Sequence, residues 1–248
     1  MRIVITGGSR GIGRILTESL LQDHEIIVLS KTKKSTEKIK KELKVKAYTT
    51  DVSDYDDVKK TFKKIGKIDA LINCAGVLGP VGGLWDNNIK DWAKTIQINL
   101  IGTVNCAKAA MPNLRKSHGK IINLSGGGSA YPRLYHSAYA SSKAAVVRFT
   151  ECLAKDLIED GLEVDVNVIA PGAHKTDMWG GEKHDKEPSE WADPRLLVKL
   201  VNFLLSEKSD GITGRFIHIK DDYEKLEKTE DSDHLTLRRI DGFKFGKI

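Results

Sequence analysis

Tyr139 and Lys143 are the two residues of this sequence best suited to move a proton. Apolar spacing predicts a helix over residues 137–158, in which a separation of four places both side chains on one face. The ordinary pKa of a tyrosine, about 10, suits neutral proton transfer poorly, but a neighbouring ammonium lowers it. The pair could then protonate a carbonyl oxygen or deprotonate an alcohol. A purely structural pair shows the same spacing, so the rest of the chain must decide.

A glycine-rich turn, TGGSRGIG over residues 6–13, directly follows the apolar run 2–6. Glycine lets the backbone turn tightly and approach a ligand, and the free amides of the next helix favour an anion. We expect a diphosphate there. The spacing G-x-x-x-G-x-G departs from the G-x-G-x-x-G of the general dinucleotide fold, and an ordinary strand-to-helix loop is the alternative.

The end of the predicted strand 25–30 bears on the choice between NAD and NADP. A carboxylate there would bind the adenosine ribose of NAD, whereas a cation would accommodate the 2′-phosphate of NADP. The chain reads SKTKK from Ser30 and Lys31 onward, with no carboxylate before Glu37, and Arg10 could reach the same phosphate. We therefore expect NADP(H) rather than NAD(H). The alternative is that these lysines are ordinary surface residues.

Strand and helix patterns alternate through residues 1–219. Short β-branched runs predict strands at 2–6, 25–30, 45–50, 68–73, 120–125, 163–170 and 215–219. Helical spacing of apolar residues predicts helices at 11–22, 36–43, 55–65, 99–115, 137–158 and 194–205. Such alternation implies parallel pairing with right-handed crossovers. The expected fold class is α/β, a single-domain doubly wound Rossmann fold with about seven parallel strands and helices on both faces.

The organisation of the chain indicates one domain over 1–220 and a C-terminal tail over 221–248. No Pro-, Gly- or Ser-rich linker divides the first part, and the charged tail could be docked or mobile. The polar stretch 179–193 follows a strand and is a candidate lid. It contains Trp179 and Trp191, which serve either packing or substrate recognition.

Composition excludes several classes of protein. The net charge is +6, but both signs alternate along the predicted helices, which argues against a nucleic-acid partner. The three cysteines show no disulfide or metal-ligand spacing, and neither do His136, His174 and His184, so no metal is expected. No run approaches the roughly 18 apolar residues of a membrane span. With no leader pattern at its start, the chain is expected to be soluble and cytoplasmic.

The order of the motifs resembles the short-chain dehydrogenase/reductase family. After the glycine turn come Asp51-Val52, NCAG at 73–76, Asn99, Leu124-Ser125, Tyr139-x-x-x-Lys143 and PGAHKT at 171–176. The match covers about residues 1–219. It implies an NAD(P)-dependent oxidoreductase acting on CH–OH or C=O groups of a small molecule. It also implies a homodimer or homotetramer formed through the helices 99–115 and 137–158.

The resemblance also implies roles for single residues. Tyr139 would be the general acid/base, Lys143 would bind the nicotinamide ribose and lower the tyrosine pKa, and Asn99 would hold a water chain. Cys74 stands where the family often has a second asparagine, so it receives no nucleophilic role. The implied cofactor-binding residues are Gly7, Ser9, Arg10, Gly11, Ile12, Gly13, Ser30, Lys31, Asp51, Val52, Asn73, Ala75, Gly76, Tyr139, Lys143, Pro171, Gly172 and Thr176.

One position departs from the family pattern. The serine that polarises the substrate oxygen usually precedes the tyrosine by 13 residues, and that position is Gly126. A backbone shift in the glycines 126–128 would let Ser125 supply the hydroxyl, with Ser129 or a backbone group as alternatives, and Ser125 could also simply end a strand. A redox sensor that binds NADP(H) without turnover therefore remains a second hypothesis. A nucleotide-sugar-modifying enzyme is a third, because related folds share Tyr-x-x-x-Lys.

Overall fold

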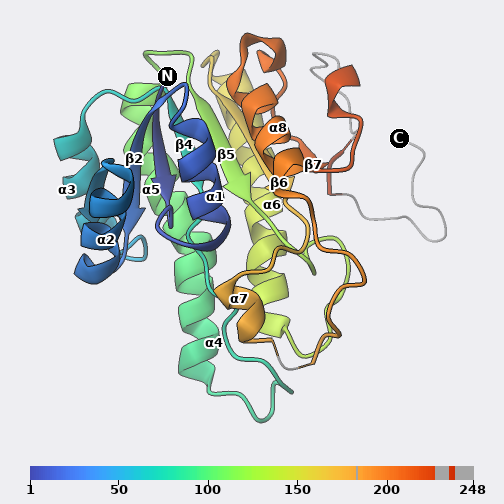
Figure 1. Cartoon of the computed structure of the whole chain (residues 1–248). Helices are drawn as coiled ribbons and strands as arrows, with labels where there is room; N and C mark the ends of the chain where they lie inside the picture. The colour runs from blue at the N-terminus through green and yellow to red at the C-terminus, as the bar shows by residue number, and fades with distance from the viewer. Residues whose placement is uncertain (183, 227–234, 238–248) are drawn as a thin grey trace.

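Seven parallel strands form one sheet in the computed structural model, which describes residues 1–182, 184–226 and 235–237 (Figure 1). Their order across the sheet is β3-β2-β1-β4-β5-β6-β7. The bounds are β1 (Arg2–Thr6), β2 (Glu25–Ser30), β3 (Lys46–Thr49), β4 (Ala70–Asn73), β5 (Lys120–Leu124), β6 (Asp165–Ala170) and β7 (Phe216–His218). The predicted α/β class, the strand positions and the parallel pairing are confirmed.

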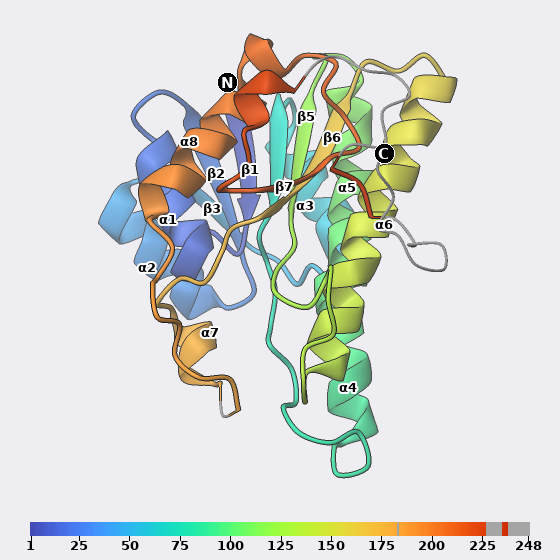
Figure 2. The ribbon, with the colours of Figure 1, turned by 90° about the vertical axis from the view of Figure 1, so that its right-hand side faces the viewer.

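Helices cover both faces of this sheet (Figure 2). One layer holds α1 (Gly11–Leu20), α2 (Lys33–Leu43) and α8 (Pro194–Leu205), and the other α3 (Tyr55–Ile65), α5 (Gly102–Leu114) and α6 (Ser137–Glu159). Successive strand residues point to opposite faces. In β1, Ile3 and Ile5 therefore pack into the first layer and Val4 into the second, all fully buried. Burial on both faces explains why the strands read as unbroken apolar runs.

The connection between β4 and α5 differs from the predicted helix 99–115. The chain forms a further helix, α4 (Ile89–Ile96), and then a π-helical stretch, Gln97–Ile101, before α5 begins. Thr95 is the only buried residue of α4, but its apolar residues Ile89, Trp92, Ala93 and Ile96 recur at helical spacing, a signal that the sequence analysis did not use. The π-helical stretch carries Asn99, which is fully buried. Such local widenings of a helix are frequent at functional sites.

The segments beyond β6 contribute short elements. Helix α7 (Asp177–Gly180) overlaps the start of the predicted lid, and two 3-10 turns lie at Glu207–Ser209 and Tyr223–Lys225. Of the predicted tail, residues 227–234 and 238–248 lie outside the described residues. The described residues 235–237 contact the body of the protein, where the Leu235 carbonyl accepts from the Phe216 amide at 2.6 Å. Within the described ranges, no helix is both long and apolar enough to cross a bilayer.

The topology places a crevice at the carboxyl edge of the sheet. Strands β1, β2 and β3 follow one another toward one edge of the sheet, and strands β4, β5, β6 and β7 follow one another toward the opposite edge. Ligands of doubly wound folds bind where the strand order reverses in this way, here between β1 and β4. Thr6, the last residue of β1, ties this point together because its hydroxyl accepts from the amides of Cys74 (3.1 Å) and Ala75 (3.0 Å).

Candidate active site

The glycine turn after β1 is packed so closely that side chains would not fit. An added Cβ at Gly7, which has φ of +68°, would lie 2.9 Å from the Ala75 Cα, and one at Gly13 would lie 2.4 Å from the Gly7 carbonyl oxygen. Helix α1 then begins without a side-chain cap, because Arg10 makes no capping bond to its amides. Uncapped amides at a helix start bind anions. These features fit the diphosphate of a dinucleotide.

A cavity of about 930 Å³ extends from this turn to the loops after β5 and β6. Its size is at the upper end of the usual range for ligand sites, which suits a dinucleotide together with a small substrate. All the predicted site residues line it except Asn73 and Asn99. The structure thus brings together residues from the turn at 6–13 and from the ends of β2 to β6.

Asn73 does not line the cavity, contrary to the role implied for it. It occupies the same face of β4 as Leu71, the face covered by α5, because residues two apart in a strand point the same way. Its amide donates to Asn123 at 2.9 Å, and the Asn123 amide in turn donates to Thr150 at 2.9 Å. Asn73 therefore belongs to a buried polar chain behind the sheet edge.

Asn99 lies behind the cavity wall and supports it. Its side-chain amide donates to the Val77 carbonyl (2.9 Å) and to the Ser142 hydroxyl (2.9 Å), while its oxygen accepts from the Val77 amide (2.8 Å). These bonds join the loop after β4 to α6. An added Cβ at Gly76 would lie 3.3 Å from the Asn99 Oδ1 and 3.6 Å from the Lys143 Nζ, so Asn99 and Lys143 approach the same small residue.

The adenosine end of the cavity carries paired charges. Lys31, directly after β2, makes an ion pair of 2.7 Å with Asp51. Burial tends to raise the pKa of Asp51, but Lys31 and the bonds donated by Ser53 outweigh burial and leave this pKa below its ordinary value. Arg10 faces Asp177 at 4.0 Å, with both side chains largely exposed. Both of these cations line the cavity.

Tyr139 and Lys143 lie in the first turns of α6, and both are buried. The Lys143 ammonium donates to the Leu124 carbonyl at the end of β5 (2.8 Å) and lies 5.8 Å from the centre of the Tyr139 ring. Burial lowers the pKa of Lys143 to about 8, with Cys74 acting in the opposite direction. Helix α6 and strand β5 thus hold the pair together at the inner end of the cavity.

The pKa of Tyr139 lies above its ordinary value rather than below it. Burial raises it to about 12, and the cation that opposes this shift is Arg133, while Cys74 adds to it. A buried phenolate is costly because it has lost its hydration. At neutral pH Tyr139 therefore holds its proton, which suits donation to a carbonyl oxygen. Residue spacing alone did not point to Arg133.

The loop after β5 places no serine hydroxyl against Tyr139. An added Cβ at Gly126 would lie only 2.5 Å from the Tyr139 Oη, so the tyrosine fills the space next to this glycine. The Ser125 hydroxyl donates to the Lys143 carbonyl over a long 3.4 Å, and the Ser129 hydroxyl donates to the Gly126 carbonyl at 2.7 Å. Both serines line the cavity.

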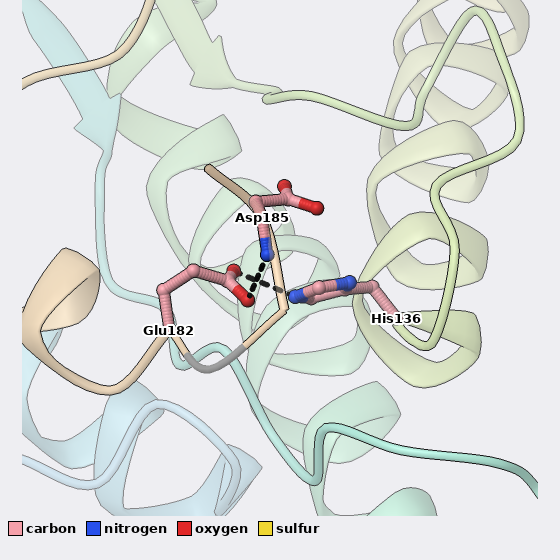
Figure 3. Close-up of side chains that lie close together, drawn as sticks. All are labelled: His136, Glu182 and Asp185. Carbon is pink, nitrogen blue, oxygen red and sulfur yellow. Dashed lines mark hydrogen bonds and ion pairs between the residues drawn. The ribbon is translucent and has the colours of Figure 1, made fainter. Parts of the chain in front are cut away.

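Three side chains missed by the sequence analysis lie at the outer side of Tyr139. Arg133 makes ion pairs of 2.6 Å with both Glu182 and Asp185. Figure 3 shows Glu182 between Asp185 and the fully buried His136, whose Nε2 lies 2.7 Å from the Glu182 carboxylate. Because 49 residues separate Arg133 from Glu182, no local spacing could reveal the contact. The predicted lid at 179–193 was the one available hint.

A parallel sheet with this glycine turn and a buried Tyr-Lys pair defines a dinucleotide-binding oxidoreductase. The short chain dehydrogenase family model matches residues 1–187. The chain belongs to the short-chain dehydrogenase/reductase family, whose members use nicotinamide cofactors and act on carbonyl and alcohol groups.

Similar proteins agree with this membership. The chain is 32% identical to a meso-2,3-butanediol dehydrogenase of Serratia marcescens, over 88% of this chain and 92% of that protein. It is 31% identical to a 3-oxoacyl-[acyl-carrier-protein] reductase of Staphylococcus aureus, over 87% and 95%. Among solved structures, ElxO with NADP bound is 28% identical, with a TM-score of 0.77 and coverage of 88% and 96%.

The Gly13→Ala variant tests the phosphate-binding turn. Its new methyl group would collide with the Gly7 backbone, so the turn must open. We expect the Kd for NADPH, measured by fluorescence titration, to rise at least about tenfold, because the backbone amides at the start of α1 would no longer point at the diphosphate. Gly180→Ala is the control, since no atom lies within 4 Å of its added Cβ. Unchanged NADPH binding by Gly13→Ala would place the cofactor elsewhere.

Proposed function

We propose that this protein is an NADP(H)-dependent oxidoreductase that transfers hydride between the nicotinamide and a carbonyl or secondary alcohol. Tyr139 is its general acid/base. The observation that carries the proposal is the buried Tyr139–Lys143 pair, which opens into the same cavity as a glycine turn shaped for a diphosphate. The bound cofactor supplies the hydride. The protein supplies orientation and the proton.

The proton moves at the Tyr139 Oη. In reduction Tyr139 donates its proton to the carbonyl oxygen, and in oxidation it accepts the proton of the alcohol. The Lys143 ammonium, fixed by the Leu124 carbonyl, stabilises the phenolate and binds the nicotinamide ribose. Asn99 holds the loop after β4 against α6 and keeps a water path to Lys143. Burial keeps Tyr139 protonated at neutral pH, and this is the form that donates the proton in reduction.

Ser125 orients the substrate oxygen in this proposal. A hydrogen bond of 3.4 Å is weak, so the Ser125 hydroxyl can leave the Lys143 carbonyl at little cost and turn toward a ligand. Ser129 holds its proton in a bond of 2.7 Å to the Gly126 carbonyl, which is harder to exchange. Ser125 also directly precedes Gly126, the position where the family carries its serine.

The preference for NADP is supported by charge at the end of β2. Lys31 lies in the cavity wall beside Ser30, and Arg10 lines the same cavity. Asp51 already binds Lys31, so a 2′-phosphate would share this ammonium with a carboxylate. The similar protein ElxO has been solved with NADP bound. The residues implied for the remaining cofactor contacts, from Ala75 and Gly76 to Pro171, Gly172 and Thr176, face the same cavity.

The proposal also covers the substrate, the assembly and the location of the protein. The names of the relatives, a butanediol dehydrogenase and a 3-oxoacyl reductase, favour a small carbonyl or alcohol substrate. We propose a homodimer or homotetramer through α5 and α6, where Ile158 exposes 49% of its surface.

The three cysteines are all free, which suits the cytoplasm. We also propose one domain over 1–220, to which the described tail residues 235–237 are bound by the contacts of Leu235 and Leu237.

The Tyr139→Phe variant tests the proposed function. Loss of the hydroxyl removes the proton donor, so NADPH oxidation with a panel of carbonyl compounds should fall by about a hundredfold or more, while the Kd for NADPH stays within about threefold. Equal turnover by native protein and variant would refute the mechanism. Tight NADPH binding by the native protein without turnover of any carbonyl or alcohol would support the redox-sensor hypothesis instead.

The Ser125→Ala and Ser129→Ala variants test which hydroxyl orients the substrate. We expect Ser125→Ala to lower kcat/KM by about 10- to 100-fold, because a hydrogen bond to the developing charge is lost, and Ser129→Ala to change it by less than about threefold. NADPH affinity serves as the internal control for both. The opposite ranking would transfer the role to Ser129. No loss in either variant would assign it to a backbone group.

The Lys31→Glu variant tests the choice of cofactor. A carboxylate at this position repels the 2′-phosphate and can bind the ribose hydroxyls, so the ratio of kcat/KM for NADPH over NADH should fall by about tenfold or more. Lys33→Glu makes the same charge change in the first turn of α2, outside the cavity lining, and should leave the ratio nearly unchanged. An equal effect of both variants would point to general surface charge.

A further inference from the structure

Arg133 contacts the ring of Tyr139, although no motif includes it. The centre of its guanidinium lies 5.7 Å from the centre of the Tyr139 ring, close to the 5.8 Å that separates the ring from the Lys143 Nζ. Its side chain is 13% exposed and lines the cavity. At this range a cation is attracted to an aromatic ring and stabilises a negative charge on its oxygen. Two cations, not one, therefore lie close to the ring of the proton-carrying residue, and Arg133 is the one that opposes the effect of burial on its pKa.

The segment after β6 holds Arg133 in this position. The Arg133 Nη2 contacts the Glu182 Oε2 and its Nε contacts the Asp185 Oδ2, each at 2.6 Å. Glu182 in turn accepts from the amides of His184 (3.0 Å) and Asp185 (3.1 Å). With its side chain only 3% exposed, Glu182 is fixed by several donors at once. Burial tends to raise its pKa, but these bonds and His136 outweigh burial and lower it to about 2.

His136 adds the last contact between the two segments. Its Nδ1 lies 2.5 Å from the Leu134 carbonyl and its Nε2 2.7 Å from the Glu182 carboxylate, so both ring nitrogens face acceptors (Figure 3). The loop before α6 and the segment after α7 are thereby joined through one buried carboxylate. Glu182 and Arg133 both line the cavity, whereas His136 is not part of its lining.

A metal ion is a poorer explanation of this cluster than an ion-pair network. The ligand atoms of His136, Glu182 and Asp185 lie within 4.8 Å of one another, which is close enough for a shared cation. However, Arg133 already binds both carboxylates, and a cation would have to displace its guanidinium. One guanidinium that donates to both carboxylates neutralises them without a metal.

We propose that Arg133 is a positioning residue for proton transfer by Tyr139, and that Glu182 and Asp185 put it in place. The proton-handling centre is then complete only when Glu182 and Asp185 hold Arg133 beside the Tyr139 ring. The inference rests on the proposed function, because it assigns a role within the same site.

The groups that face Tyr139 set the direction of the expected effect. They are Lys143 from α6, Arg133 from the loop after β5 and Cys74 from the loop after β4. Burial raises the pKa of the Cys74 thiol to about 12, so it carries no charge at neutral pH. The positive charge of Arg133 lowers the pKa of Tyr139, whereas burial raises it. Without that charge the pKa of Tyr139 must rise further.

Arginine and glutamate variants test the proposal by tyrosine titration. Protein carrying tyrosine labelled with carbon-13 at Cζ is titrated by NMR, and the Tyr139→Phe spectrum identifies the Tyr139 signal. In Arg133→Gln we expect the ionised fraction of Tyr139 at about pH 11 to fall about threefold or more, and Arg133→Lys to restore part of it. Arg195→Gln, which changes a 91% exposed arginine, is the matched control and should leave the titration unchanged.

The Glu182→Gln variant separates positioning from simple charge balance. If Glu182 positions Arg133, its loss displaces the guanidinium and the Tyr139 pKa rises, as in Arg133→Gln. If Glu182 merely neutralises Arg133, the freed positive charge lowers the Tyr139 pKa, and the proposal is overturned. An unchanged Tyr139 titration in Arg133→Gln overturns it as well.

Kinetics then distinguish this proposal from the proposed function. In Arg133→Gln the pH profile of kcat for alcohol oxidation should move to higher pH, in step with the NMR titration. A fall in kcat at every pH without such a movement would indicate a structural role only and contradict the proposal. Native protein without turnover would refute the proposed function, whereas the NMR titration would still decide the role of Arg133.

Discussion

The burial of an ionisable pair at the carboxyl edge of the sheet is the constraint on which the rest of this structure depends. Tyr139 and Lys143 are held where their charged forms are poorly solvated. Burial therefore raises the pKa of Tyr139 and lowers the pKa of Lys143, and both shifts favour the neutral form. A charge can be buried only beside partners that replace water. The end of β5 offers such a partner, since the Leu124 carbonyl accepts from Lys143. The pair therefore requires both the helix that carries it and the strand behind it.

The parallel sheet brings these partners to one edge. Every strand of a parallel sheet ends on the same side, so the loops after β1, β4, β5 and β6 meet around one cavity. Thr6 fixes two of these loops to each other through the amides of Cys74 and Ala75. The packing at Gly7 and Gly13 then follows, because the turn must fit between that loop and α1. One hydroxyl and two small residues thus shape the cofactor end of the cavity.

Residue patterns predicted what depends on local spacing and missed what depends on distant contacts. The strands and the glycine turn follow from apolar runs and glycine positions within a few residues. The side of β4 that Asn73 occupies could also have been predicted, because Leu71, two residues earlier, is a core residue of the same face. Helix α4 could have been predicted as well, because Ile89, Trp92, Ala93 and Ile96 lie on one of its faces, although only Thr95 of this helix is buried. The contact of Arg133 with Glu182 joins two loops that only the folded chain brings together.

The glycine at position 126 and the position of Tyr139 depend on each other. A side chain at 126 would reach within 2.5 Å of the Tyr139 hydroxyl, so the tyrosine can occupy this position only while residue 126 is a glycine. The family's serine is therefore not merely absent, because the space for it is filled. In its place the loop after β5 provides a weakly bonded hydroxyl at Ser125 and, seven residues beyond Gly126, the guanidinium of Arg133. The hydroxyl proposed to orient the substrate oxygen and the cation beside the tyrosine ring thus come from the same loop.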